Sequence, residues 1–251
     1  MSSLVVYIAI MIVALIGMVV CSKKQSTMPV AKVISIVLMI VVAGCLVMVL
    51  KDQFGGGSTS ALRDNENKFY VSQAFVVGDY VKGKLAGGKI LIVADPSYKQ
   101  DTRMNDFVAA MKKGVGGDVE VDTIELPPTN EEMAEPISER MTAKDFDAVI
   151  ARNSDAKVVV SLIGLPRDLK NLKAIANCKS GKGPAIILLS SDVPQLGQMI
   201  GAGMVTAAVT VSPKAVFNEE PAPSDEKAAF AVRYILVDKS NVEENKGLFG
   251  N

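Results

Sequence analysis

The chain has 251 residues, 49% of them hydrophobic and 22% charged, which accommodates one good-sized domain and additional segments. Lysine plus arginine and aspartate plus glutamate balance at 27 each, and aromatic residues make up 5%, so neither charge nor stacking rings indicate nucleic-acid binding. Histidine is absent, which excludes Ser-His-Asp and Cys-His catalysis and removes the commonest metal ligand, so we expect no catalytic set, metal site or cofactor.

Two apolar stretches at the start of the chain predict a transmembrane hairpin, with spans of about residues 4–21 and 33–50. Each stretch is close to the roughly 18 to 20 residues that cross a bilayer core. The loop between them carries Lys23, Lys24 and Lys32. The positive-inside rule therefore places this loop in the cytoplasm and the large domain in the periplasm or exterior, beyond the cytoplasmic membrane.

Two alternatives for these spans stay open. A cleaved signal peptide would explain the first span, but the stretch lacks a basic start and a small-x-small cleavage site. Val42-Ala43-Gly44-Cys45 resembles the lipobox of bacterial lipoproteins, and Cys45 would then carry the lipid. An apolar run directly after this cysteine argues against that alternative.

The composition along the chain predicts four parts. Residues 1–53 form the membrane hairpin, 54–64 a flexible linker, 65–240 an α/β domain and 241–251 a C-terminal tail. The linker prediction rests on the run of three glycines followed by serine and threonine. This run is not a phosphate-binding loop, because no Lys-Ser or Lys-Thr follows at the required spacing.

The α/β domain is predicted around the apolar run Ile90–Ala94, which is typical of a parallel strand buried on both faces. Apolar residues at helical spacing follow it, with Asp101 placed to cap the first turn of the helix and Gly114 just past its last turn. A helix over residues 65–85 precedes the strand, weakened by Gly78. Because Asp95 and the residues after it follow a parallel strand, they lie where open α/β sheets usually bind ligands.

Strands and helices alternate through the rest of the domain. The predicted elements are an edge strand over 119–126, a short helix or loop over 130–141, a helix opened by Thr142, a central strand over 157–163, a helix ending near Cys178, a strand over 185–189, a helix capped by Asp192 and a strand over 204–211. Residues 230–237 are predicted as a last strand, with a helix as the alternative. This alternation predicts a Rossmann-like three-layer α/β sandwich with a mainly parallel sheet of five to six strands.

Polar residues gather in the turns at the carboxyl edge of this predicted sheet. They are Asp95, Ser97, Tyr98, Arg167, Ser190, Ser191 and Asp192. One interpretation is a ligand site in which Arg167 and helix N-termini offer positive potential to a carboxylate or phosphate. The other is ordinary capping and turn chemistry, with a solvated Arg167.

The order of these segments resembles one lobe of the type I periplasmic substrate-binding proteins, particularly the leucine/amide-binding branch. The resemblance covers roughly residues 88–212 and rests on Lys89–Tyr98, Thr142–Phe146, Asp155–Val160 with Gly164, and Pro184–Asp192. In that family two lobes close on a small solute. The resemblance implies that Ser97, Tyr98, Gly164 and Ser191 lie at the cleft, whereas a second lobe is missing from this chain.

Three hypotheses for function follow. The first is a non-enzymatic, membrane-anchored scaffold or accessory subunit of an envelope complex, with a protein partner or a second copy of the chain. The alternative is a tethered domain that binds or senses a small-molecule solute through the carboxyl-edge turns. The third, an enzyme, would need carboxylate-only chemistry around Asp95 and Asp192.

Overall fold

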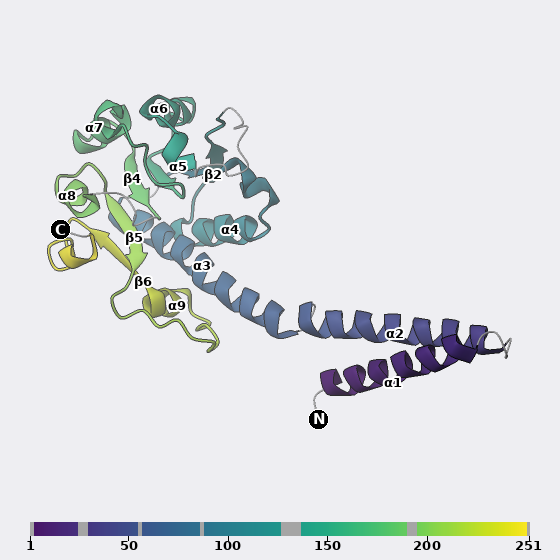
Figure 1. Cartoon of the computed structure of the whole chain (residues 1–251). Helices are drawn as coiled ribbons and strands as arrows, with labels where there is room; N and C mark the ends of the chain where they lie inside the picture. Colours follow the sequence, from purple (N-terminus) through teal and green to yellow (C-terminus); the bar gives the residue numbers. More distant parts are fainter. Residues whose placement is uncertain are drawn as a thin grey trace. The chain divides into compact units, whose positions relative to one another are not determined.

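The computed structural model describes residues 3–24, 30–54, 57–85, 88–126, 137–189 and 195–249. The chain divides into two compact units, Met1–Asp64 and Asn65–Asn251. The first contains two long apolar helices and the second contains a six-stranded α/β domain (Figure 1).

The first unit is a helical hairpin of α1 (Ser3–Lys24) and α2 (Val30–Phe54). Large apolar side chains point outward around both helices; Val13 is 70% exposed and Ile40 is 67% exposed. By length and composition, the windows Val6–Lys23 and Val33–Leu50 are able to cross a membrane. A helix that exposes apolar side chains all round suits a hydrocarbon environment better than water.

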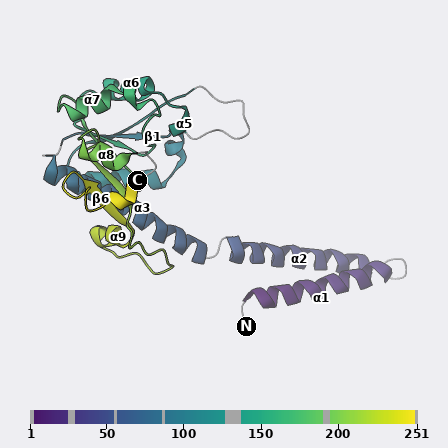
Figure 2. The same cartoon turned by 60° about the vertical axis from the view of Figure 1, so that its left-hand side comes forward.

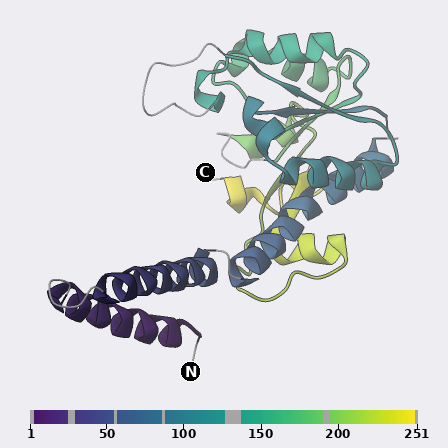
Figure 3. The same ribbon diagram turned by 90° about the vertical axis from the view of Figure 1, so that its right-hand side faces the viewer.

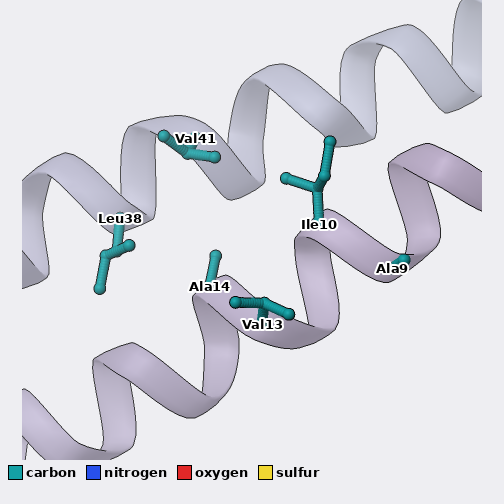
Figure 4. Close-up of a pocket in the computed structure, with 6 residues that line it drawn as sticks. All are labelled: Ala9, Ile10, Val13, Ala14, Leu38 and Val41. Atoms are coloured by element: carbon teal, nitrogen blue, oxygen red, sulfur yellow. The ribbon is translucent and has the colours of Figure 1, made fainter.

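The two helices of the hairpin approach each other through small residues. Ala14 is buried, and a Cβ atom added to Gly17 would lie 3.0 Å from Cδ1 of Leu38. Beside this contact runs a groove of about 350 Å³. Its lining is entirely apolar, as Figure 4 shows, and consists of Ala9, Ile10, Val13, Ala14, Leu38 and Val41. Only hydrocarbon groups match such a lining.

The second unit is built on one sheet in the order β2-β1-β3-β4-β5-β6. The strands are β1 (Ile90–Ala94), β2 (Val119–Thr123), β3 (Val158–Ser161), β4 (Ala185–Leu188), β5 (Ala207–Val211) and β6 (Tyr234–Asp238). Strands β1 to β5 are parallel to one another, and β6 is antiparallel to β5. The predicted fold class is therefore confirmed, with β2 at an edge and β1 and β3 inside the sheet.

Helices cover both faces of the sheet (Figures 1, 2 and 3). One face carries α3 (Gly57–Lys84), α4 (Arg103–Val115) and α9 (Glu226–Arg233), and the other carries α6 (Ala143–Arg152), α7 (Lys173–Lys179) and α8 (Leu196–Gly201). The strands supply both cores because successive side chains point to opposite faces. Leu91 and Val93 pack under α6 and α7, whereas Ile90 and Ile92 pack under α3 and α4.

Several helix starts follow from local polar chemistry. Thr142 and Asp145 form a capping box at the start of α6, since the Thr142 side chain accepts from the Asp145 amide and the Asp145 carboxylate accepts from Thr142. Asp101 was predicted to cap α4, and its Oδ1 accepts a 3.0 Å hydrogen bond from the amide of Arg103, although the N-cap residue is Thr102. Such bonds satisfy amides that have no partner within the helix. The prediction that Gly114 follows the helix was wrong, because Gly114 lies inside α4 and the C-cap residue is Gly116.

The structure differs from the sequence prediction at both ends of the domain. Residues 57–64, predicted as flexible linker, lie in α3, because a helix already held by packing extends at little cost through helix formers such as Ala61 and Leu62. Gly55 and Gly56 lie outside the described residues. At the other end, the predicted tail packs on the domain, where the Phe249 ring contacts Gly197 of α8.

Two further element predictions need correction. Residues 230–233, predicted as strand, belong to α9, because the Asp225 side chain accepts from the Ala228 amide and starts a helix there; the strand begins only at Tyr234. The N-cap residue of α8 is Gln195, and the predicted cap, Asp192, lies outside the described residues. Of the predicted segment 130–141, residues 137–140 form the short helix α5 (Ile137–Arg140), and residues 127–136 lie outside the described part.

The crossing of α3 over α4 depends on two glycines. A Cβ atom on Gly78 would lie 2.5 Å from the carbonyl oxygen of Met111, and one on Gly114 would lie 2.3 Å from the carbonyl oxygen of Phe75. Both distances are far below van der Waals contact, so any side chain would push the two backbones apart. Gly78 therefore serves close packing, which its low helix propensity would not suggest.

We expect Gly78→Ala to lower the free energy of unfolding by about 1 to 3 kcal/mol, because overpacking outweighs the better helix propensity of alanine. Gly83→Ala is the matched control, since nothing lies within 4 Å of its added Cβ in the same helix. It should raise stability by up to about 1 kcal/mol. Urea unfolding of the detergent-solubilised full-length protein, followed by tyrosine near-UV circular dichroism, measures both, and equal effects of the two variants would contradict the close crossing.

Candidate functional site

The sheet has a topological switch point between β1 and β3. These strands are neighbours, and the chain leaves β1 toward α4 on one face but leaves β3 toward α7 on the other. The two connections therefore diverge at the carboxyl edge. Open α/β sheets bind ligands in the crevice at such a point, so the turns after β1 and β3 define the candidate site.

The turn after β1 is a short 3₁₀ helix, η1 (Pro96–Gln100), which is ordered by Asp95. Oδ1 of Asp95 accepts a 2.8 Å hydrogen bond from the Ser97 amide, and its carbonyl accepts a 2.9 Å bond from the Tyr98 amide. Ser97 is exposed, Asp95 is half-buried, and the Tyr98 ring packs against the core under α3 and α4. The hydroxyl groups and the carboxylate of this turn are thus held on a fixed backbone.

The turn after β3 is fixed by a buried serine. The Leu162 amide continues the ladder with a 2.9 Å bond to the Val93 carbonyl. The Ser161 hydroxyl then donates a 2.6 Å bond to the carbonyl of Gly164, which has φ of +76°. A residue with a side chain is strained at this φ. The sequence analysis did not select Ser161, since a hydroxyl at the end of an apolar strand carries no signal of its partner.

Arg167 lies in a different arrangement from the one predicted. Its guanidinium forms an ion pair with the Glu139 carboxylate of α5, and the arginine side chain is largely exposed. Its charge is therefore balanced locally, and it does not stand as a free cation over the turns after β1 and β3. The neighbouring Asp168 is also engaged, because its Oδ1 accepts a 2.7 Å bond from the Ala143 amide at the start of α6.

The predicted site residues fall into three groups. Asp95, Ser97, Tyr98 and Gly164 occupy the adjacent ends of β1 and β3. Arg167 pairs with Glu139. Ser190, Ser191 and Asp192 lie outside the described residues, so their predicted part in the site stays a prediction.

A cavity of about 400 Å³ lies beside the edge strand β2, away from all of the predicted residues. Its lining consists of Asp122, Ile124, Glu125, Asp145, Ala148, Val149 and Arg152. Arg152 reaches across it to both oxygens of Asp122, at 2.6 and 2.8 Å, and to the Thr123 carbonyl at 2.6 Å. The bond to the Arg152 guanidinium lowers the pKa of Asp122 to about 2. The pair lies on the wall of the cavity and covers part of the open sheet edge.

In the part of the chain that the structure describes, carboxylates do not converge in a way that suggests a metal site. Within the described ranges, no group of three or more aspartate, glutamate or cysteine side chains gathers closely enough to hold an ion. Cys178 is half-buried, and its sulfur lies 3.6 Å from the Thr206 hydroxyl, a contact that links α7 to the start of β5.

No protein-family model and no curated protein matches the sequence. Solved structures with a similar fold include an inositol-bound carbohydrate transporter protein from Acidothermus cellulolyticus, with TM-score 0.44 and 13% identity over 71% of this chain and 60% of that one. An arabinose-binding protein from Geobacillus stearothermophilus has TM-score 0.41 and 12% identity, over 69% and 62% of the two chains. A sugar-binding protein from Bacillus halodurans has TM-score 0.41 and 11% identity, over 69% and 64%.

The chain therefore spans about three fifths of the length of these proteins. They are sugar-binding proteins, and nothing among them supports the leucine/amide-binding branch named in the sequence resemblance.

Removal of the Asp122 carboxylate should give a pH-dependent loss of stability. Because the pKa of Asp122 in the folded chain lies below its ordinary value of 3.8, the ion pair stabilises the fold above about pH 4, and this contribution disappears as the pH falls toward 2. We expect Asp122→Asn to lower the free energy of unfolding by up to about 1 kcal/mol at neutral pH, because Arg152 is half exposed and the ion pair is partly screened by water. Near pH 2 the substitution should not change the free energy of unfolding. Urea midpoints measured across this range, with Glu125→Gln as control, would contradict the assignment if both variants behaved alike.

Proposed function

We propose that the chain is a membrane-anchored domain that binds a small, neutral, hydroxyl-bearing solute at the carboxyl edge between β1 and β3. One observation carries this proposal: the switch point of the sheet coincides with a turn that presents a carboxylate and two hydroxyl groups, those of Asp95, Ser97 and Tyr98. A topological switch point is the default ligand site of an open α/β sheet.

The groups at this edge match the hydroxyl groups of a polyol or sugar. Oδ1 of Asp95 already accepts from Ser97, and no described residue donates to Oδ2, which leaves an acceptor for a ligand hydroxyl. The exposed Ser97 hydroxyl both donates and accepts. The Tyr98 ring is held by the core, so it offers a fixed apolar face beside a polar tip, as sugar rings require.

The charge at this edge argues against an anionic ligand. The arginine expected to attract a carboxylate or phosphate pairs with Glu139, and Asp95 would repel an anion. Lys99 is exposed in the same turn, and its mobile side chain is the cation with which an anion could still pair. Substitution of Lys99 distinguishes an anionic ligand from a neutral one.

The apolar hairpin supplies the proposed anchor. Each of its helices contains an apolar window of 18 residues, and these windows bury 6% and 0% of their residues inside the molecule. Helices of this kind are stable when lipid surrounds them. The lysines between the spans support a cytoplasmic loop and a domain that faces the periplasm or exterior.

This proposal replaces the scaffold as the first hypothesis. The described residues at the β1/β3 edge are a carboxylate and hydroxyl groups, which suit a small polar ligand better than a protein partner. An enzyme based on Asp95 and Asp192 stays the third hypothesis, since Asp192 lies outside the described residues and Asp95 already accepts a hydrogen bond from the Ser97 amide.

The first test is ligand release. Native mass spectrometry of the full-length protein, extracted gently from its own membrane, should show a small molecule at one per chain. Myo-inositol and arabinose, which are named for two of the similar structures, are the first probes for thermal-shift measurements. A ligand at about 100 times its Kd should add about 2.7 kcal/mol to stability.

Two substitutions locate the site. Asp95→Asn keeps an oxygen for the Ser97 amide, and Tyr98→Phe keeps the packed ring, so both should remain folded and both should lose the ligand-induced shift. Arg167→Gln and Lys99→Gln are the charge controls and should retain it. If the controls lose the shift while Asp95→Asn keeps it, the ligand is an anion and the neutral-solute proposal is wrong.

A further inference from the structure

Three large apolar side chains of the α/β domain are strongly exposed and lie in one short segment. Val211, Val216 and Phe217 are 46%, 49% and 64% exposed. Among the described residues of the second unit, they are the large apolar side chains in the exposed class. We refer to these three residues as the apolar edge patch. Single exposed apolar residues are normal, but a cluster rimmed by polar residues marks an interaction surface.

The patch is held rigidly. The Val216 amide donates a 3.1 Å bond to the Val232 carbonyl, and the Ser212 amide donates a 2.8 Å bond to the Arg233 carbonyl. The Phe217 ring lies 5.0 Å from the guanidinium carbon of Arg233. The backbone of this segment is therefore hydrogen-bonded to the last turn of α9.

Arg233 itself is almost completely buried. Its guanidinium stacks on Phe69 of α3 at 3.6 Å and forms a two-bond ion pair with Glu66, at 2.6 and 2.8 Å. The patch is thereby coupled to the beginning of the domain part of α3. Phe217 covers this buried cation from outside while most of its own ring remains uncovered.

The patch lies where the chain enters the domain. Val211 is the last residue of β5, so the patch belongs to the carboxyl edge of the sheet. Asn65 of α3 binds the adjoining loop, donating a 2.8 Å bond to the Glu220 carbonyl and accepting a 2.5 Å bond from the Ala222 amide. The first residues of the domain and the apolar edge patch therefore stay together.

Residues 51–64, which we call the tether, limit the distance between this patch and a membrane. Residues 51–64 separate Leu50, the last residue of the second apolar window, from Asn65. This segment covers about 20 Å as a helix and at most about 50 Å when extended. A surface held within this distance has a high effective concentration relative to the bilayer. A small apolar contact is therefore sufficient to keep the surface bound to the bilayer.

We propose that the apolar edge patch docks on the bilayer interface, with Phe217 inserted among the lipid headgroups. Aromatic and aliphatic side chains are the groups that partition into this layer. Glu219 and Glu220 are exposed close by, opposite in sign to Lys214, so the contact does not depend on anionic lipid. The inference rests on the membrane anchor of the proposed function and is independent of ligand binding.

The sequence contains no tryptophan, so a single substitution gives an unambiguous probe. The Phe217→Trp variant of the full-length protein is reconstituted in phosphatidylcholine vesicles. Its tryptophan should emit at a shorter wavelength than the tryptophan of the same variant when the protein is unfolded. Its emission should be quenched when the lipid is brominated in the upper acyl chain. Added salt should leave this quenching unchanged, because the contact is apolar.

Lys182→Trp is the matched control. Lys182 is exposed in the loop before β4, at the amino edge of the sheet, and should not be quenched by brominated lipid. Val216→Trp repeats the test if Phe217→Trp lowers the unfolding temperature. Equal quenching at residues 182 and 217, or none at either patch position, overturns the proposal.

A second copy of the chain is the competing occupant. It would give Phe217→Trp emission that changes with the ratio of protein to lipid but is insensitive to bromine, and this result also overturns bilayer docking. Ligand binding at the β1/β3 edge is measured in the same preparations by thermal shift. A failure of ligand binding with retained quenching contradicts only the proposed function, and the reverse result contradicts only the docking.

Discussion

The approach of α3 to α4 through Gly78 and Gly114 is the constraint on which the arrangement of the domain depends. Where two helix backbones meet without side chains between them, the helices have one register and one crossing point. Contacts on both sides of this point then follow: the Tyr70 ring lies 4.8 Å from Phe107, and the Lys113 ammonium lies over Phe75. The chain enters the α/β domain through α3. The contact between α3 and α4 therefore also fixes the position at which the chain enters this domain.

The direction of the strands puts that place at the carboxyl edge of the sheet, where the candidate site also lies. A helix that directly precedes a parallel strand and packs on its sheet must run antiparallel to the strand, so its first residues lie at the carboxyl edge. Asn65 and Glu66 show this directly, since they bind the loop and the arginine beside the carboxyl end of β5. Near the other end of α3, the Tyr80 hydroxyl interacts with Asp238 at the end of β6, and burial followed by this carboxylate raises the pKa of Tyr80. Tether and candidate site thus share one edge by topology.

Much of the fold could be predicted from the sequence, because the local preferences of these segments for helix or strand agree with the structure of the whole domain. The uninterrupted apolar run of β1 and the Thr142 capping box predict their elements, and the order of strands brings Asp95 and Gly164 to one edge. The features that the sequence did not predict depend on contacts between distant residues. The role of Gly78 depends on a partner 36 residues away in the sequence, and the neutralisation of Arg167 depends on Glu139. Patterns within a single element contain no information about such pairs.

The charges of the domain also decide what kind of chemistry its edge supports. Arg103 pairs with Asp101, Arg152 with Asp122 and Arg233 with Glu66, so these guanidinium groups hold turns, strand edges and helix ends. An arginine engaged by a carboxylate loses most of its attraction for a soluble anion, because binding would require breaking the existing pair. The turn after β1 contains the Asp95 carboxylate, the Ser97 and Tyr98 hydroxyl groups and the exposed Lys99, and the first three are groups able to accept hydrogen bonds. A chain with balanced composition can therefore present hydroxyl groups beside one carboxylate and one lysine, and this local arrangement is what the proposed function rests on.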